Sequence, residues 1–379
     1  GLNASGTQTL NSVDSVSGGN GTDTITIITN TAGTYAPTLA SVENVSLNNT
    51  AGGAVTLDMT NATGVTSITA VSPSAQNLSF NNIGDLSTSL NVSSMTLGAT
   101  VTFDMLDSAV SGTSDSASLT ITSSTTGTVV VDAAVETLNL ISSGNTNTLT
   151  ALTNSVNTIN ISGSAGITLG GTNTTAETFT STSTGAVTLT SNNSSASSYT
   201  GGAGVDSITY TGGTAVVETV NAGAGNDVIT FTASLDDVDV LNGGDGVDVL
   251  AGISADMVAL TTANNISNFE TIRVTDNLGA NLTAATVQAG IDTVRLDGTA
   301  AARTITFEAG SKTVDLRATV GGNLTVNDTG TATTDALTIT NNDAAADQFA
   351  GNNLTVGGFE TVTFNGTGTG AATSQDFGT

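Results

Sequence analysis

The sequence predicts an all-β protein, a parallel right-handed β-solenoid or β-roll with two strands in each coil of about 20–22 residues. Three observations lead to this prediction: short alternating strand patterns, a constant distance between equivalent strands, and glycine-rich turns at the same distance. A single coil cannot bury its apolar face, whereas stacked coils share one continuous core.

The strand pattern is a six-residue phrase in which apolar and polar residues alternate. It occurs at 42–47, 135–140, 156–161, 269–274 and 359–364, and in four of these phrases a glutamate holds the second position. Alternation with a period of two buries one face of a strand. Hydrophobic residues make up 37% of the chain and the mean hydropathy is +0.16, which argues against a disordered chain.

The central apolar residues of these phrases recur at nearly constant intervals. One series is Leu138, Ile159, Phe179, Tyr199, Val220 and Val240, and a second is Val129, Leu149, Ile167, Val187, Ile208, Ile229 and Val249. The spacing continues upstream in Val45, Ile68 and Leu90, interleaved with Leu57, Leu78 and Val101, and downstream in Ile272, Val294, Val314 and Leu337. Two interleaved series with one period predict two strands per coil, each stacked in parallel on its counterpart.

Interruptions near 104–118 and 251–268 suggest soft boundaries. We expect N-terminal solenoid coils at 1–110, a central β-roll at 111–251 with glycine-rich turns at 201–250, and C-terminal solenoid coils at 252–379. The alternative is one continuous rod that changes its coil size. Short helices are expected near 254–264, with Ser254 as N-cap, and near 283–290.

The turns at 201–206, 222–227 and 243–248 repeat one sequence and end in Asp206, Asp227 and Asp248, two steps of 21 residues. Residues one coil apart stack, so we expect a column of carboxylates about 5 Å apart. Each neighbouring pair would cost about 1 kcal/mol even in water. Calcium would remove that cost because it accepts about six to eight oxygen ligands, including carbonyls. The alternative is that Gly and Asp are simply good turn formers.

The pattern G-G-x-G-x-D-x-U-x is matched at every fixed position by residues 201–209 and 243–251. The segment 222–230 departs from it only at the first glycine, and the segment 18–26 is an isolated match near the start of the chain. The turns therefore resemble the RTX nonapeptide family. The resemblance implies Ca²⁺ bound between coils, with these ligands: Asp206, Asp227, Asp248, the carbonyls of Gly202, Gly204, Gly223, Gly225, Gly244 and Gly246, and Asp23 in the isolated copy. The family's coil has about 18 residues. Because the intervening turns at 210–217 and 232–240 lack the motif, calcium is expected at one edge only.

Charge and composition exclude several functions. The net charge is −27 with only five basic residues, which excludes a general nucleic-acid binder and disfavours an anionic membrane surface. The chain has no His, no Cys and one Lys, which argues against an enzyme. The sequence contains no segment long enough to insert in a membrane. Because it begins with Gly rather than Met, we expect a processed product or a piece of a longer protein.

Two further groups of charged residues leave alternatives open. Asp236, Asp237 and Asp239 form a second acidic cluster, which is a solvated turn, another ion site, or a catalytic set as in β-helical polysaccharide hydrolases. The basic residues either make a head-to-tail contact between copies or pair with Glu270, Asp292 and Asp315; they are Arg273, Arg295, Arg303, Lys312 and Arg317.

The composition, the turns and the V/F-E-T-I/V phrase together resemble the surface-layer proteins of Gram-negative bacteria. The resemblance implies a non-enzymatic structural protein that is secreted by a type I system, needs calcium, and forms a lattice with its own copies on the extracellular cell surface. Outer-membrane polysaccharide is a second candidate partner. The alternatives are a repeat segment of a large secreted calcium-dependent adhesin and a secreted polysaccharide-active enzyme.

Overall fold

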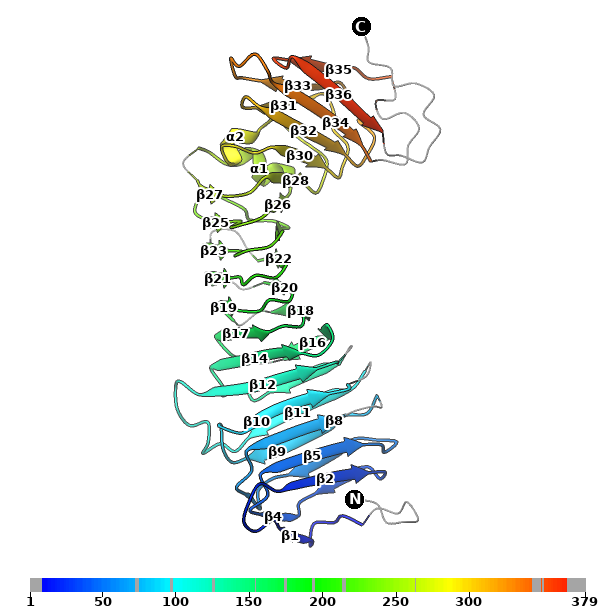
Figure 1. Cartoon of the computed structure of the whole chain (residues 1–379), viewed down its shortest axis with the longest axis vertical. Helices are drawn as coiled ribbons and strands as arrows, with labels where there is room; N and C mark the ends of the chain where they lie inside the picture. The colour runs from blue at the N-terminus through cyan, green and yellow to red at the C-terminus, as the bar shows by residue number, and fades with distance from the viewer. Residues whose placement is uncertain are drawn as a thin grey trace. The chain divides into compact units, whose positions relative to one another are not determined.

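The computed structural model describes residues 9–71, 75–95, 98–124, 127–153, 155–173, 176–192, 195–212, 216–262, 264–342, 349 and 351–366. This part of the chain is an all-β parallel β-solenoid of about 15 turns, with two short helices (Figure 1). Backbone contacts divide the chain into unit 1, Gly1–Asn193 with Tyr199–Gly204, and unit 2, Ser194–Ser198 with Val205–Thr379. The three-part division expected from the sequence stays a prediction.

Unit 1 is built from ladders of parallel strands that run up successive coils. The first ladder is β2 (Thr24–Thr29), β5 (Asn44–Asn49), β8 (Ser67–Val71), β10 (Ser89–Ser93), β12 (Ser116–Thr122), β14 (Thr137–Ser143), β17 (Thr158–Gly163) and β19 (Thr178–Ser181). The second is β3 (Gly33–Tyr35), β6 (Val55–Asp58), β9 (Leu78–Ile83), β11 (Thr100–Met105), β13 (Thr128–Val131) and β16 (Ala151–Thr153). A third ladder begins with β15 (Asn147–Leu149), β18 (Ile167–Asn173) and β20 (Val187–Ser191).

The first coils of unit 1 carry an additional short strand each, namely β1 (Ser15–Ser17), β4 (Thr38–Ala40) and β7 (Ala62–Thr63). These coils therefore have three strands rather than the two expected from the sequence, and so does the coil that contains β14, β15 and β16. β21 (Ser197–Thr200) is divided between the two units.

Unit 2 has one long ladder and two shorter ones. The long ladder is β22 (Ser207–Tyr210), β24 (Val228–Phe231), β26 (Val249–Gly252), β28 (Thr271–Val274), β30 (Thr293–Leu296), β32 (Ser311–Leu316), β34 (Ala336–Asn341) and β36 (Thr361–Gly366). The others are β23 (Glu218–Asn221), β25 (Val240–Asn242) and β27 (Asn265–Ser267), and then β29 (Leu282–Thr283), β31 (Arg303–Phe307), β33 (Leu324–Asp328) and β35 (Leu354–Gly357).

The core of each unit is formed by the inward side chains of stacked strands, as the alternating phrases predict. Phe80 and Phe103 stack in unit 1 with ring centroids 5.6 Å apart, and Tyr210 and Phe231 stack in unit 2 at 5.1 Å. Such offset pairs contribute about 0.5–1.5 kcal/mol beyond the apolar area they bury.

Many of the predicted stacking partners are confirmed by the strand register. They include Val45, Ile68 and Leu90; Leu138, Ile159 and Phe179; Ile167 and Val187; Ile208 and Ile229; and Ile272, Val294 and Val314. A constant spacing of apolar residues therefore predicts register wherever the turns between strands keep their length.

Other predicted partners are wrong by one to three positions. The observed pairs are Leu57 with Phe80, Val129 with Leu152, Leu149 with Leu169, Val220 with Leu241, Ile229 with Leu250, and Val314 with Ile339. At these places a turn changes length, or a second apolar residue stands nearby and satisfies the same pattern. Val240, the predicted partner of Val220, is 43% exposed, while Leu241 is buried.

Both expected helices exist and are shorter than their predicted ranges: α1 is Ser254–Ala259 and α2 is Ala284–Val287. Ser254 is the first helical residue rather than the N-cap, which is Ile253. The Ser254 backbone N–H donates to Oδ1 of Asp276 (2.6 Å), and its hydroxyl oxygen accepts the N–H of Gly279 (2.9 Å). Among the described residues, neither helix has the length or apolar character that a membrane crossing requires.

Candidate functional site

The three aspartates of the glycine-rich turns form the column that their spacing predicts. Each lies directly before a strand of the long ladder of unit 2, and the pairing of Ser207 with Val228 and of Val228 with Val249 aligns them. All three are buried, with exposed fractions of 1% for Asp206 and 0% for Asp227 and Asp248. We call these residues, together with Glu270 one coil further on, the acid column.

Hydrogen bonds link successive members of the acid column. The backbone N–H of Asp206 donates to Oδ1 of Asp227, and the N–H of Asp227 donates to Oδ1 of Asp248, both at 2.7 Å. The N–H of Asp248 donates in the same way to Oε2 of Glu270 (2.7 Å). Each carboxylate therefore orders the backbone of the coil before it.

The other carboxylate oxygen is left without a partner. Oδ2 of Asp227 and Oδ2 of Asp248 are buried and accept no hydrogen bond from the described residues. The pKa of Asp227 is raised to about 6, mainly by burial and also by the charges of Asp206 and Asp248, while the hydrogen bond from the Asp206 N–H lowers it. Burial also raises the pKa of Asp248, with smaller contributions from Glu270 and Asp245. A buried ionised carboxylate without a counter-charge is costly, so the column favours a proton or a cation.

The later two turns have the backbone that the glycines predict. The φ angle is 102° at Gly223, 141° at Gly225, 98° at Gly244 and 150° at Gly246. Residues with a side chain rarely adopt these values. The turns also stack closely, since the N–H of Gly225 donates to the carbonyl of Asp245 (2.9 Å) and the N–H of Asp245 donates to that of Gly223 (2.8 Å). A Cβ at Gly244 or Gly246 would collide with the carbonyl oxygen of Gly223 or Gly225.

Gly202 and Gly204 belong to unit 1 and differ from these glycines. Neither has a positive φ. A Cβ at Gly202 would collide with the carbonyl oxygen of Ser183, and one at Gly204 with that of Gly185. Glycine is therefore required at these two positions for close backbone approach rather than for left-handed geometry, in contrast to the four glycines of the later two turns.

The isolated copy of the motif at Asp23, in unit 1, shows the same kind of contact between two acids that lie one coil apart. The Asp23 N–H donates to Oε2 of Glu43 (2.7 Å), and Oδ2 of Asp23 is buried without a hydrogen-bond partner among the described residues. Gly19 and Gly21 have φ angles of 91° and 116°. Glu43 is therefore the stacked acid that the sequence did not identify for Asp23.

Glu43 holds the second position of the six-residue strand phrase at 42–47, and its contact explains why four of these phrases have a glutamate there. Oε2 of Glu136 accepts the N–H of Asp115 (2.7 Å), and Oε2 of Glu360 accepts that of Asp335 (2.8 Å). In each case the acceptor lies one coil after the donor. Sequence analysis missed this role, although the signal was present as pairs of acids about one coil apart.

The second acidic cluster contains a buried pair that the sequence did not show. Asp239 is 0% exposed and lies against Glu218, which is 2% exposed. Burial raises the pKa of Glu218 to about 8, and the hydrogen bond to Asp239 and the charges of Asp239 and Asp236 add to the rise. Asp237 takes no part in the pair, since its carboxylate accepts the N–H and hydroxyl of Thr261 (2.8 and 2.9 Å).

Four of the five basic residues form ion pairs within unit 2. Arg273 and Arg295 both contact Asp297, at 2.6 Å each, rather than Glu270. The other two pairs are those expected: Lys312 with Asp292 (3.1 Å) and Arg317 with Asp315 (2.9 Å). These contacts account for four of the five basic residues by ordinary pairing, and Arg303 forms no ion pair with the described residues.

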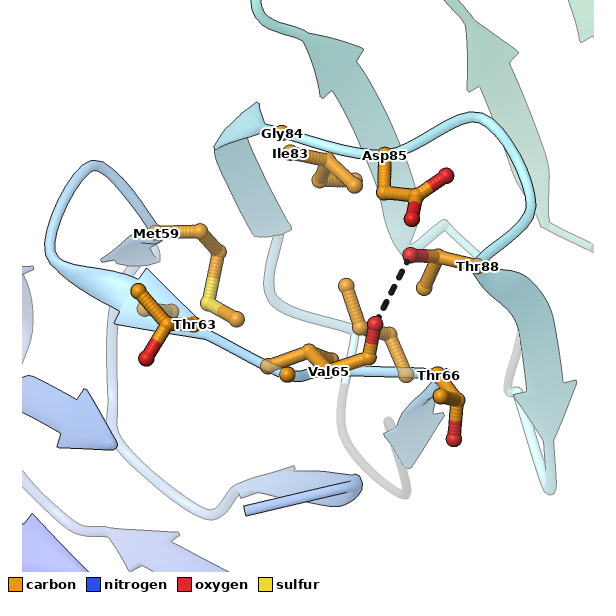
Figure 2. A pocket seen from close by; sticks show the side chains of 11 residues that line it. Met59, Thr63, Val65, Thr66, Ile83, Gly84, Asp85 and Thr88 are labelled. Atoms are coloured by element: carbon orange, nitrogen blue, oxygen red, sulfur yellow. Dashed lines mark hydrogen bonds between the residues drawn. The ribbon is translucent and has the colours of Figure 1, made fainter. Parts of the chain in front are cut away.

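A groove of 340 Å³ in unit 1 lies between successive turns and is lined by residues such as Met59, Val65, Ile83 and Asp85 (Figure 2). The Thr88 hydroxyl donates to the carbonyl of Val65 across it (3.2 Å). Oδ1 of Asp85 accepts the N–H of Ser87 (2.8 Å), which lowers the pKa of Asp85. The Asp85 carboxylate thus stabilises its own turn.

The acid column fits calcium in the chemistry of its donors, because carboxylate and carbonyl oxygens are the ligands that this ion prefers. The partnerless oxygens of Asp227 and Asp248 are available for it. In the described ranges, no group of three or more acidic side chains is close enough to hold a metal ion. A calcium ion here would therefore need backbone carbonyls and water in addition to the carboxylates.

Comparison with known proteins gives no relative: no family model, no curated protein and no solved structure matches this chain. The functional interpretation therefore rests on the residues and their geometry.

Proposed function

We propose that this chain is a structural protein of a bacterial surface layer, secreted without its calcium and stabilised outside the cell when calcium binds at the glycine–aspartate turns. The observation that supports this most directly is the acid column, with two buried carboxylate oxygens that have no hydrogen-bond partner among the described residues. The proposal includes no catalytic activity.

Asp206, Asp227 and Asp248 would hold the ions, together with carbonyls of Gly223, Gly225, Gly244 and Gly246. Bound calcium would supply positive charge to a column that otherwise contains only acids. The backbone N–H bonds along the column already fix one oxygen of Asp227 and of Asp248, so less conformational freedom is lost when the second oxygen gains a ligand.

The same arrangement gives a mechanism for folding after export. In the low calcium of the cytosol the charged column disfavours stacking of the coils from Val205 to Gly252, so this part of the chain stays loose during secretion. Outside, the free energy of ion binding adds to the free energy of folding, because the unfolded chain has no preformed site.

A calcium titration of the purified protein tests the proposal. Circular dichroism should report a calcium-dependent gain of β-structure or thermal stability, and negative-stain microscopy should show sheets or ordered arrays in calcium but not in chelator. Asp245→Asn is the matched control for Asp227→Asn, because Asp245 lies in the same set of turns with an exposed side chain.

The possible results separate the function from its alternatives. Folding that is independent of calcium would overturn the role of the turns. Calcium-dependent folding of a protein that stays monomeric and binds surface polysaccharide saturably would instead favour the adhesin segment. Turnover of a polysaccharide would favour the enzyme.

A further inference from the structure

A second pair of acids lies outside the glycine–aspartate turns, at the start of the strands in the other ladder of unit 2. Glu218 is the first residue of β23, and Asp239 directly precedes β25. The pairing of Thr219 with Val240 places the two acids one coil apart. The turns that precede β23 and β25 lack the glycine–aspartate motif, so the sequence offers an ion site here only as one alternative for the cluster of Asp236, Asp237 and Asp239.

The contacts of the pair are well defined. The Glu218 N–H donates to Oδ1 of Asp239 (3.0 Å), and the Asp236 N–H donates to Oδ2 of Asp239 (3.0 Å). The strand pairing and the Glu218 N–H bond bring the two acids together, and burial with the neighbouring charge of Asp239 raises the pKa of Glu218. Both oxygens of Asp239 are therefore oriented by fixed partners.

Glu218 supplies the observation that points to a ligand. The exposed fraction of Glu218 is 2%, so the residue is almost fully buried. Its Oε2 atom has no hydrogen-bond partner within the described ranges. An unsatisfied acceptor of this kind costs about 1–3 kcal/mol, and more when it is charged. No basic residue precedes Arg273 in the chain, and the ion pairs formed by later basic residues involve other acids.

We propose that Glu218 and Asp239 form a second site for a hard divalent cation such as calcium, separate from the glycine–aspartate turns. The two carboxylates supply the charged ligands, and backbone carbonyls and water complete the shell. The site extends ion binding to the second edge of the coil, where the motif alone predicts none.

Tyr210 offers a spectroscopic probe for this pair. It lies at the end of β22, four residues after Asp206, and its hydroxyl interacts electrostatically with both Glu218 and Asp239. The chain has three Tyr and no Trp. Terbium replaces calcium at oxygen sites and emits when a nearby tyrosine is excited, so Tyr210 should sensitise an ion held by the pair.

The experiment measures tyrosine-sensitised terbium emission and, separately, calcium stoichiometry by titration calorimetry. Wild type should emit, and Glu218→Gln should lose most of the emission and about one bound calcium per chain. The glutamine variant keeps a hydrogen-bond donor toward Asp239, so it should fold; circular dichroism checks this, and Asp239→Asn provides a second variant. Tyr210→Phe should lose emission but keep the calcium stoichiometry.

Two further variants make the result decisive. Glu177→Gln, at an exposed glutamate of unit 1, should change neither reading. Asp227→Asn should keep the sensitised emission, because the acid column is a different site. If Glu218→Gln and Asp239→Asn keep wild-type emission and stoichiometry, the pair holds only a proton and the proposal is overturned. Emission that is lost in Asp227→Asn but kept in Glu218→Gln would also overturn it, while leaving the proposed function of the turns intact.

Discussion

Replacing Asp227 with asparagine should change stability in opposite directions without and with calcium. The asparagine keeps an oxygen that can accept the N–H of Asp206, the contact made by Oδ1 in the wild type. It removes the charge from a side chain that is 0% exposed. Without calcium this removal is favourable, whereas with calcium it removes a ligand.

The magnitude follows from the pKa of Asp227. The difference between its pKa of about 6 in the folded protein and the ordinary value of 3.8 corresponds to about 3 kcal/mol. Because the folded form holds the proton more tightly, stability is highest below pH 3.8 and falls as the pH rises to about 6. At pH 7.5 the wild type carries the full cost, so Asp227→Asn should be more stable by up to about 3 kcal/mol in chelator.

Chemical unfolding at pH 7.5, followed by circular dichroism, measures this difference. Calcium at about 100 times its Kd would stabilise the wild type by about 2.7 kcal/mol per site. The asparagine variant should gain clearly less and need more calcium to reach the same midpoint. Asp245→Asn removes the same charge at an exposed position of the same set of turns, so both of its midpoints should move much less than those of Asp227→Asn.

Two results would refute the reasoning. An Asp227→Asn protein that is less stable than wild type in chelator would show that the charge is not a cost. A calcium midpoint equal to that of the wild type would show that Asp227 is not a ligand.

Three more outcomes are expected. Without divalent ions, the urea midpoint of the wild type should fall steadily between pH 4 and pH 8. The reason is that Asp227 and Glu218, with pKa values of about 6 and about 8, keep protons in the folded protein that the unfolded chain has already lost. A rising midpoint would contradict the burial of these charges. Gly246→Ala should destabilise the protein by roughly 1–3 kcal/mol in thermal or urea unfolding because of its φ of 150°, while Gly52→Ala, with no atom within 4 Å of the new Cβ, should have little effect. Lys312→Met should lower the unfolding free energy by about 1–3 kcal/mol, since it removes a buried ammonium that donates to a backbone carbonyl.

The fold and the acid column could be predicted because both depend on distance along the chain. Glycine turns of constant length fix the register at Asp206, Asp227 and Asp248, and the observed strand pairing follows. Individual partners were less predictable where two apolar residues are adjacent. Val240 and Leu241 satisfy the same hydrophobic pattern, and only the three-dimensional packing decides that Leu241 is buried.

The Glu218–Asp239 pair could not be recognised from sequence motifs. Glu218 stands alone among apolar and small residues, and Asp239 is one of three neighbouring aspartates that look equivalent. What distinguishes them is burial, which depends on the coil above and below. The interval of 21 residues between them was the one signal present, and it equals the interval along the acid column.

The uneven distribution of basic residues has a physical explanation in the same columns. The register carries the acid column beyond Glu270 to Asp292, and there the buried ammonium of Lys312 contacts the carboxylate. Arg273 on β28 and Arg295 on β30 both form ion pairs with Asp297. Where lysine or arginine is present, the turns lack the glycine–aspartate motif; where the motif is present, no basic residue is near in sequence. In unit 2, basic side chains thus neutralise acids such as Asp292 and Asp297. The acids of the glycine–aspartate turns have no basic partner near in sequence and depend on a proton or on a cation from solution. Calcium should therefore stabilise the coils from Val205 to Gly252 more than the coils that follow.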